Sequence, residues 1–293
     1  MGRGFALSRL LRLLKLTRQG MAKWRGSVQR AGKLKGEVAA LLAAHREDHR
    51  RDGSRQSYYG AQAKEKLGVG VTKFERMASE LGLTIKPKRR WVRTSDRCSR
   101  SSQYKNLTNG LVLNGPGQLI VADLFYFTGP KRYYVFVLTD VYLGKLAGLS
   151  GGRRMTAEVA LVALDQFFEW RGEGEHPRTI HHSDGGSQYF SDIYLERLKR
   201  AKIQVSVAAS CQENGHAEQK NDTVKNRYLR FLDTSTDAAF EQSLKKVKQL
   251  VNEARVMKSK GWKTPVAFEA MVATMDEASR PKITLHDFTQ TRP

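Results

Sequence analysis

Apolar runs and helix-patterned stretches alternate along the chain downstream of Gly117. The runs at 118–127 and 132–141 are rich in β-branched and aromatic residues, and the Gly129-Pro130-Lys131 break between them predicts a β-hairpin. Strands are expected at 118–127, 132–141, 145–150, 178–183 and 203–209, and helices at 156–170, 191–202, 214–231 and 238–258. This order predicts an α/β fold with a mixed five-stranded sheet and helices on both faces, the RNase H-like layout.

Upstream of this region the pattern is helical. Residues 37–50 form the first expected helix, 54–68 the second and 71–82 the third, and the last two end at glycines. Two short helices joined by the Gly68-Val69-Gly70 turn are typical of a helix-turn-helix, although any helical hairpin gives the same pattern. A small all-α helix-turn-helix domain is therefore expected before the sheet.

The last of these helices carries Lys73 and Arg76, which a helix-turn-helix would present to a DNA groove. A basic, Ser-rich stretch without periodicity follows, and we expect it to be a linker extended along a phosphate backbone. Its candidate DNA-binding residues are Lys86, Lys88, Arg89 and Arg90.

Charge is distributed unevenly over the expected segments. The chain has 51 Lys and Arg residues against 29 Asp and Glu residues, a net charge of +22, and residues 1–116 hold +18 of it. The segments are a basic amphipathic arm (1–36), a helix-turn-helix-like DNA-binding domain (37–83), a basic linker (84–116), an RNase H-like catalytic core (117–275) and a C-terminal tail (276–293). Such a positive excess favours a polyanionic partner, either nucleic acid or a membrane surface.

Membrane insertion is not expected. The longest apolar stretch near the front, residues 38–44, is far shorter than the about 20 residues that span a bilayer. The first 36 residues contain ten Lys or Arg and no Asp or Glu. That composition also fits an organellar transit peptide, but Ser is sparse there, which favours a basic arm that contacts DNA or a partner protein.

Cysteine and histidine indicate neither a disulfide framework nor a zinc module. Cys98 and Cys211 are the two cysteines, so a reducing compartment is the default expectation. His45 and His49 stand one helical turn apart, but no Cys-x-x-Cys pair accompanies them. A solvated helix face is therefore expected there rather than a metal site.

Three acidic residues stand where phosphate chemistry would need them. Asp123 lies inside an apolar strand, Asp184 directly follows another strand, and Glu218 lies near the start of a helix. Carboxylates that converge from distant positions cannot all stay ionised without compensation. Two Mg²⁺ ions about 3.5–4 Å apart would supply it and would clamp the attacking and leaving oxygens of a phosphodiester. Mn²⁺ is an expected substitute.

Each of these acids also has a simpler interpretation. Asp123 could be a surface residue on the polar side of a strand end, and Asp184 a turn residue before two glycines. Glu218 could belong to an exposed, salt-bridged helix face. A metal site requires all three to meet.

The helix that begins near residue 214 offers two further candidates. Glu213 is the rival third carboxylate, although in the first helical turn it could instead serve the helix dipole. Asp222 and Lys225 fall on the same helical face as Glu218. Lys225 is therefore expected to grip DNA near the cleaved bond.

The C-terminal half resembles the integrase catalytic core that DDE transposases share with retroviral integrases. The chain is similar to the second-frame protein of the bacterial IS-three group of insertion sequences, over about residues 37–275. The matching strings are YYGAQAKEKLGVGVTKFERMASELGL, YKNLTNG, IVADLFYF, HHSDGGSQYF, Asn214-x-x-x-Glu218 with Lys225, and KTPVAFE. The chain departs from the family pattern at Ile120, Phe125, Glu213 and Gly215, which leaves fine specificity open.

The resemblance implies metal-dependent DNA strand cleavage and strand transfer during transposition, with Asp123, Asp184 and Glu218 as the catalytic and metal-binding triad. It implies double-stranded DNA, both element ends and target, as the substrate, and a homo-oligomer on that DNA. An upstream-frame protein is a further candidate partner, and a bacterial cytoplasmic, nucleoid-associated location is expected. The alternatives are a non-catalytic DNA-binding remnant or regulator that occupies element ends, and a nuclease of the same fold that cleaves RNA–DNA hybrids.

Overall fold

The computed structural model describes residues 11–85, 104–208 and 215–287. The chain divides into two compact units, one of Met1–Glu47 with Arg51–Pro87 and the other of Asp48–Arg50 with Lys88–Pro293. Within the described ranges, no helix combines the length and the apolar character that crossing a membrane requires.

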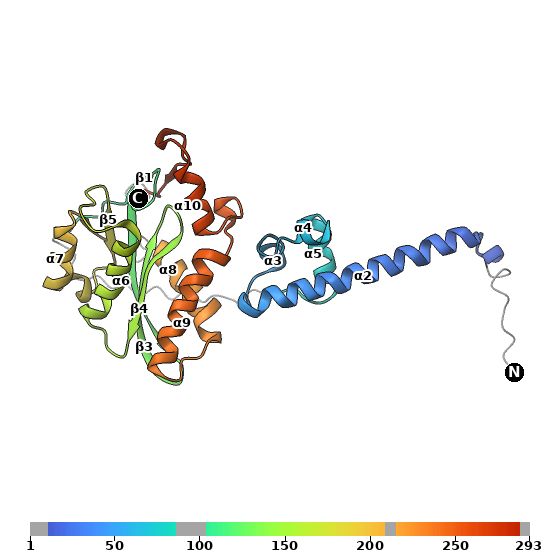
Figure 1. The fold of residues 1–293 in the computed structure, drawn as a ribbon, viewed down its shortest axis with the longest axis horizontal. Helices are drawn as coiled ribbons and strands as arrows, with labels where there is room; N and C mark the ends of the chain where they lie inside the picture. The colour runs from blue at the N-terminus through green and yellow to red at the C-terminus, as the bar shows by residue number, and fades with distance from the viewer. Residues whose placement is uncertain (1–10, 86–103, 209–214, 288–293) are drawn as a thin grey trace, which may run out of the picture. The chain divides into compact units, whose positions relative to one another are not determined.

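Helices build the described part of the first unit (Figure 1). They are α2 (Arg18–Asp48), α3 (Ser54–Gly60), α4 (Ala63–Leu67) and α5 (Val71–Glu80). Val38 and Leu42 of α2 are buried against the three short helices, in a cluster whose largest members are Tyr58, Phe74 and Met77. The N-terminal half of α2 lies outside this cluster, and Trp24 there is 60% exposed.

Two elements of this unit differ from the sequence expectation. α2 runs without a break across residue 36, so the second half of the basic arm and the following helix are one element. The helix expected at 54–68 is interrupted at Gln62, whose φ is 54°. A residue in the left-handed region cannot continue a right-handed helix, so two short helices replace one.

The expectation that His45 and His49 lie on a solvated face is wrong. The side chain of His45 is 8% exposed, and its Nε2 lies 3.3 Å from Oδ2 of Asp52. His49 is also buried. Helix α3 approaches closely at Gly60, where a Cβ would lie 2.6 Å from Cε1 of His45.

A five-stranded sheet forms the centre of the second unit (Figure 1). Its strands are β2 (Leu119–Thr128), β3 (Arg132–Asp140), β4 (Lys145–Gly152), β5 (Ile180–Ser183) and β6 (Gln204–Val207). The spatial order is β4-β3-β2-β5-β6. The β2–β3 and β3–β4 pairs are antiparallel, whereas β2–β5 and β5–β6 are parallel. This mixed sheet with flanking helices confirms the RNase H-like fold class predicted from the hydrophobic pattern.

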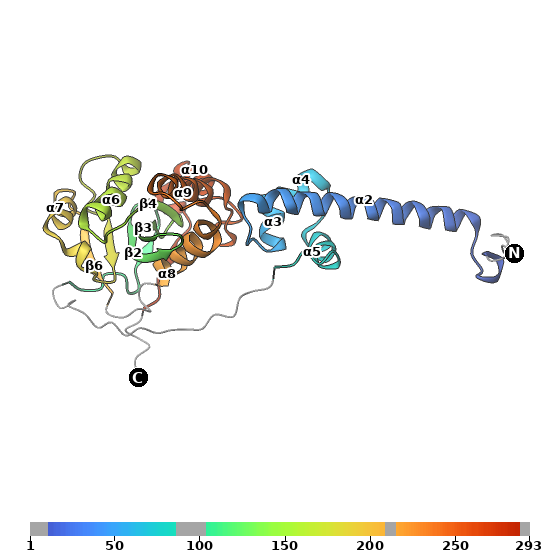
Figure 2. The same cartoon turned by 90° about the horizontal axis from the view of Figure 1, so that it is seen from below.

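Helices cover both faces of the sheet, as Figure 2 shows. Helices α6 (Ala157–Arg171) and α7 (Asp192–Arg200) pack on one face through buried aromatic and aliphatic side chains. Helices α8 (Gly215–Asp222), α9 (Asp237–Gln249) and α10 (Pro265–Ala273) lie on the other side. The sheet is therefore the middle of three layers, as a sheet with two apolar faces requires.

The two long helices expected near the C-terminus are each interrupted. Helix α8 passes into the π-helical segment η4 (Thr223–Tyr228), and α9 passes into the π-helical segment η6 (Leu250–Ala254). A π-helical turn has i→i+5 hydrogen bonds in place of the i→i+4 bonds of an α-helix and occurs mostly as a short bulge within one.

Two segments expected to be linker and tail are packed onto the second unit. Strand β1 (Val112–Leu113) pairs antiparallel with β7 (Ile283–Thr284), and Leu113 and Leu285 are buried. The described end of the linker, from residue 104, and the described start of the tail therefore contribute to the core.

Two buried lysines stabilise the turn between β3 and β4. Lys220 of α8 donates a hydrogen bond to the carbonyl of Gly144 at 2.6 Å, and Lys260 donates one to the carbonyl of Tyr142. Asp140, at the end of β3, is fully buried and accepts hydrogen bonds from two backbone amides. Burial raises the pKa of Asp140 to about 6 and lowers the pKa of Lys220 to about 7. The turn is thus held by polar groups that are almost entirely buried.

Burial of His181 on β5 makes stability depend on pH. Its Nε2 lies 2.9 Å from the hydroxyl of Tyr194, and burial, followed by the charge of His182, lowers its pKa to about 3. An unfolded histidine titrates near 6.5. Between these two values the unfolded chain binds a proton that the folded chain does not, so this contribution to stability is lost as the pH falls.

We expect His181→Gln to reduce the acid sensitivity of folding. In the wild type, this residue should lower the free energy of unfolding by up to about 1.4 kcal/mol per pH unit below pH 6.5. Urea unfolding of both proteins at pH 7, 6 and 5 measures the difference in slope. Parallel slopes would show that His181 is protonated equally in the folded and unfolded states.

Candidate active site

The alternation of side chains along β2 turns Asp123 toward the α8 side of the sheet. Ile120 and Ala122 belong to the cluster under α6 and α7, whereas Val121 belongs to a cluster on the opposite face. Successive side chains of a strand point to opposite faces. Asp123 therefore shares the face of Val121, in the middle of the strand and partly buried. The interpretation of Asp123 as an ordinary strand-end surface residue fails.

The parallel pairing of β2 with β5 brings the second acid alongside the first. Ala122 lies opposite Ser183 in the register, so the next residues of the two strands are Asp123 and Asp184. Gly185, with a φ of 79°, lets the chain turn directly after the acid. The carboxylate of Asp184 is exposed and accepts a hydrogen bond from the backbone amide of Gly186 at 3.1 Å.

Helix α8 supplies the third acid. Glu218 lies in its first turn and is exposed, and α8 packs against β2 and β3. Burial raises the pKa of Asp123 to about 7, and the nearby charges of Asp184 and Glu218 act in the same direction, against the amide of Leu124. The three acids predicted from the sequence therefore lie within electrostatic reach of one another.

Two polar side chains beside Asp123 were not identified from the sequence. The Nδ2 of Asn221, on α8, donates a hydrogen bond to Oδ2 of Asp123 at 2.7 Å. Tyr189 is buried, and its pKa is raised well above the usual value by burial and then by the charge of Asp123. The Tyr189 hydroxyl and the Asn221 Oδ1 are buried and have no hydrogen-bond partner among the described residues. The sequence feature that could have identified Asn221 is its position three residues after Glu218.

The donor set of the three carboxylates suits a hard divalent cation, which prefers oxygen ligands. Burial, followed by the charges of Asp184 and Glu218, raises the pKa of Asp123, and a bound cation would oppose these effects. In the described part of the chain, the oxygens of the three acids do not all lie within 4.8 Å of one another. Asp184 and Glu218 are exposed, so rotation of their side chains onto a cation disturbs little packing. The residues therefore fit a metal site.

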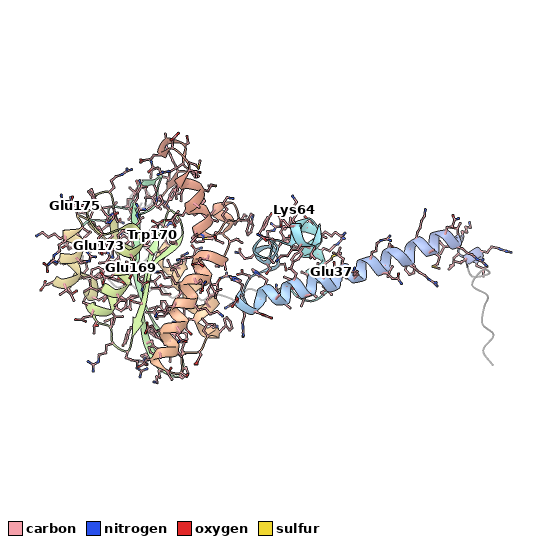
Figure 3. The ribbon with its side chains drawn as sticks, viewed as in Figure 1. Glu37, Lys64, Glu169, Trp170, Glu173 and Glu175 are labelled. Carbon is pink, nitrogen blue, oxygen red and sulfur yellow. The ribbon has the colours of Figure 1, made fainter. Side chains whose placement is uncertain are left out.

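Two acidic residues on the loop after α6 are paired with basic side chains. Figure 3 labels Glu173 and Glu175 on the loop after α6. Glu173 lies 2.8 Å from the guanidinium of Arg197, and Glu175 lies 2.8 Å from the ammonium of Lys202. Among the described residues, Asp123 has no such ion pair. Asp123 thus differs from these two glutamates in lacking a basic partner within the described part of the chain.

Lys225 is engaged by strand β2 of the protein itself. It belongs to η4, and its Nζ donates a hydrogen bond to the carbonyl of Tyr126 at 2.9 Å. The same ammonium lies 5.6 Å from the ring of Phe125 and 5.1 Å from that of Tyr126. Burial lowers its pKa. A role for Lys225 in binding DNA stays a prediction.

The other predicted DNA-binding residues divide into two groups. Lys73 and Arg76 are exposed on α5, where Nε of Arg76 lies 3.7 Å from Glu80. The predicted linker contacts Lys86, Lys88, Arg89 and Arg90 lie outside the described residues. The same is true of Glu213, the rival third carboxylate, and of Asn214 in the matched motif.

Comparisons with known proteins agree with this geometry. The model of the family "Integrase core domain" matches residues 114–211. The match includes Asp123 and Asp184 and ends before Glu218. It is 29% identical to the insertion element IS600 uncharacterized 31 kDa protein of Shigella sonnei, with 68% of this chain and 75% of that protein covered. It is 27% identical to the transposase for insertion sequence element IS629 of the same organism, with 70% of each covered.

Another relative is the putative transposase for insertion sequence element IS986/IS6110 of Mycobacterium tuberculosis, 29% identical over 69% of this chain and 73% of that protein. Among solved structures, the HTLV-2 integrase catalytic core domain in complex with magnesium is 18% identical, with a TM-score of 0.44, over 53% of this chain and 97% of that one. The transposase relatives confirm the recognition of a DDE transposase, whose general chemistry is polynucleotidyl transfer. The IS-three group stays a prediction.

The raised pKa of Asp123 predicts a conflict between stability and function. A carboxyl group whose folded pKa is raised stabilises the fold fully only below its unfolded pKa of about 3.9, and this contribution is lost as the pH rises through 7. We therefore expect Asp123→Asn, measured at pH 8 without divalent metal, to raise the free energy of unfolding by about 1–3 kcal/mol. This range allows for screening of the charges by solvent.

Urea unfolding at pH 8 and pH 4 measures this effect, and the gain should nearly vanish at pH 4. Asp192→Asn on α7, where the acid is exposed, is the matched control and should change little. A destabilised Asp123→Asn protein at pH 8 would contradict the stated cause of the shift.

Proposed function

We propose that this transposase cleaves DNA at the ends of its element and joins the freed 3′ end to target DNA at one site. Asp123, Asp184 and Glu218 are the catalytic residues of this proposal. The observation that carries it is the register of β2 and β5, which sets two acids side by side under the helix that bears the third.

The three carboxylates would hold two Mg²⁺ ions, with Mn²⁺ as a substitute. When bound, such ions activate a nucleophile and stabilise charge on the phosphodiester. The chain's own contribution is to fix the acids on rigid elements, a strand centre, a strand end and a packed helix. With the backbones fixed, rotation of the Asp184 and Glu218 side chains alone would complete the set of metal ligands.

The first unit would grip double-stranded DNA. Helix α5 exposes Lys73 and Arg76, and residues 1–116 carry a net charge of +18. The basic linker residues Lys86, Lys88, Arg89 and Arg90 would extend this contact. Because two element ends must be held together, a homo-oligomer on DNA is part of the proposal, and an upstream-frame protein is a candidate partner.

Loss of one acid should abolish the chemistry while leaving the fold intact. We expect Asp184→Asn to reduce cleavage and joining on the order of 10³-fold, since several kcal/mol of charge stabilisation are lost. The assay uses linear DNA that carries the inverted repeats flanking the gene, with Mg²⁺. Asp192→Asn, an exposed acid on α7, should retain activity. Full activity of Asp184→Asn would show that Asp184 is not a catalytic residue.

The grip on DNA should depend on salt. We expect the double variant of Lys73→Ala with Arg76→Ala to bind duplex DNA more weakly and to lower the slope of log affinity against log salt by about 1–2. Fluorescence anisotropy between 50 and 300 mM salt measures both quantities. Lys245→Ala, which removes a cation paired with Glu241 in the second unit, is the control. An unchanged slope would exclude α5 from the phosphate contact.

A further inference from the structure

We propose that Asn221 is a positioning residue that orients the carboxylate of Asp123 for metal binding. The inference rests on the proposed function. Asn221 lies three residues after Glu218 on α8, so both side chains project from the same side of the helix. One helix therefore presents a metal-binding acid and a hydrogen-bond donor to the same strand.

The two oxygens of Asp123 are each held by one donor. Oδ1 accepts from the backbone amide of Leu124 at 2.8 Å, and Oδ2 accepts from Nδ2 of Asn221 at 2.7 Å. A carboxylate offers about four lone-pair sites. Each oxygen thus retains a site for a cation, while rotation of the group is restrained from both sides.

An amide is suited to this task in a way that a basic side chain is not. A lysine or arginine at position 221 would neutralise Asp123 and would compete with a cation for it. The amide of Asn221 is uncharged, so it fixes the direction of the carboxylate and leaves its negative charge available. Residues that orient metal ligands in this manner commonly change metal affinity by 10–100-fold.

The carbonyl oxygen of the Asn221 side chain shows that packing alone does not explain why an asparagine occupies this position. Its Oδ1 is buried and has no hydrogen-bond partner among the described residues. Turning the amide over would set this oxygen against Oδ2 of Asp123, so the observed orientation is the one that keeps the hydrogen bond. An apolar side chain would avoid the unsatisfied acceptor altogether. The contact with Asp123 is what the amide adds.

The test compares Asn221→Leu, which matches the amide in size, with Asn226→Leu. Asn226 makes an analogous contact, from Nδ2 to Oδ1 of Asp222 at 2.9 Å, further along the same helical segment. Binding of Mn²⁺ to the full chain without DNA is titrated by electron paramagnetic resonance. We expect Asn221→Leu to weaken Mn²⁺ binding by about tenfold or more, and Asn226→Leu to leave it unchanged.

A second readout separates positioning from folding. The thermal midpoint without metal should not fall in Asn221→Leu, whereas the Mg²⁺ concentration for half-maximal DNA cleavage should rise about tenfold. Affinity for DNA should be unchanged. If Asn221→Leu does not fold, Asn221→Ser replaces it, with the same expected loss of metal affinity.

Two results would overturn the inference in distinguishable ways. If the wild type binds Mn²⁺, Asp184→Asn is inactive and Asn221→Leu binds Mn²⁺ like the wild type, positioning by Asn221 is wrong and the proposed function stands. If the wild type itself binds no Mn²⁺ and Asp184→Asn remains active, the inference and the proposed function both fail.

Discussion

The burial of Asp123 beside two further acids is the constraint on which this site depends. Asp123 is held inside the sheet by β2, which cannot move without disrupting its register with β3 and β5. The other two acids stand at exposed positions, where they can adjust. A bound cation would offset the burial of Asp123 and the charges beside it, so binding of the ion would raise the stability of the folded state.

Much of this arrangement follows from local pattern. The apolar runs and the Gly129–Lys131 break predict the β2–β3 hairpin, and the apolar run around Asp123 predicts that this acid lies inside a strand. The position of Asp184 directly after a short apolar strand similarly predicts an acid at the carboxyl end of that strand. These features depend on side-chain burial alone, which the sequence displays directly.

Other features depend on contacts between distant segments and are invisible to local pattern. The pairing of β1 with β7 joins stretches that read as linker and tail. The break at Gln62 depends on backbone conformation at a residue with no strong turn preference. Asn221 has the right spacing from Glu218, but its role appears only once α8 is known to lie over β2. Neither the helix face nor its partner strand can be read from one segment.

The length of α2 has a mechanical consequence. A helix of 31 residues extends about 46 Å, and only its C-terminal half is fixed by the cluster with α3, α4 and α5. The free half is continuous with the fixed half through unbroken backbone hydrogen bonding. A partner that binds the free half would therefore be joined to the three short helices by one continuous element.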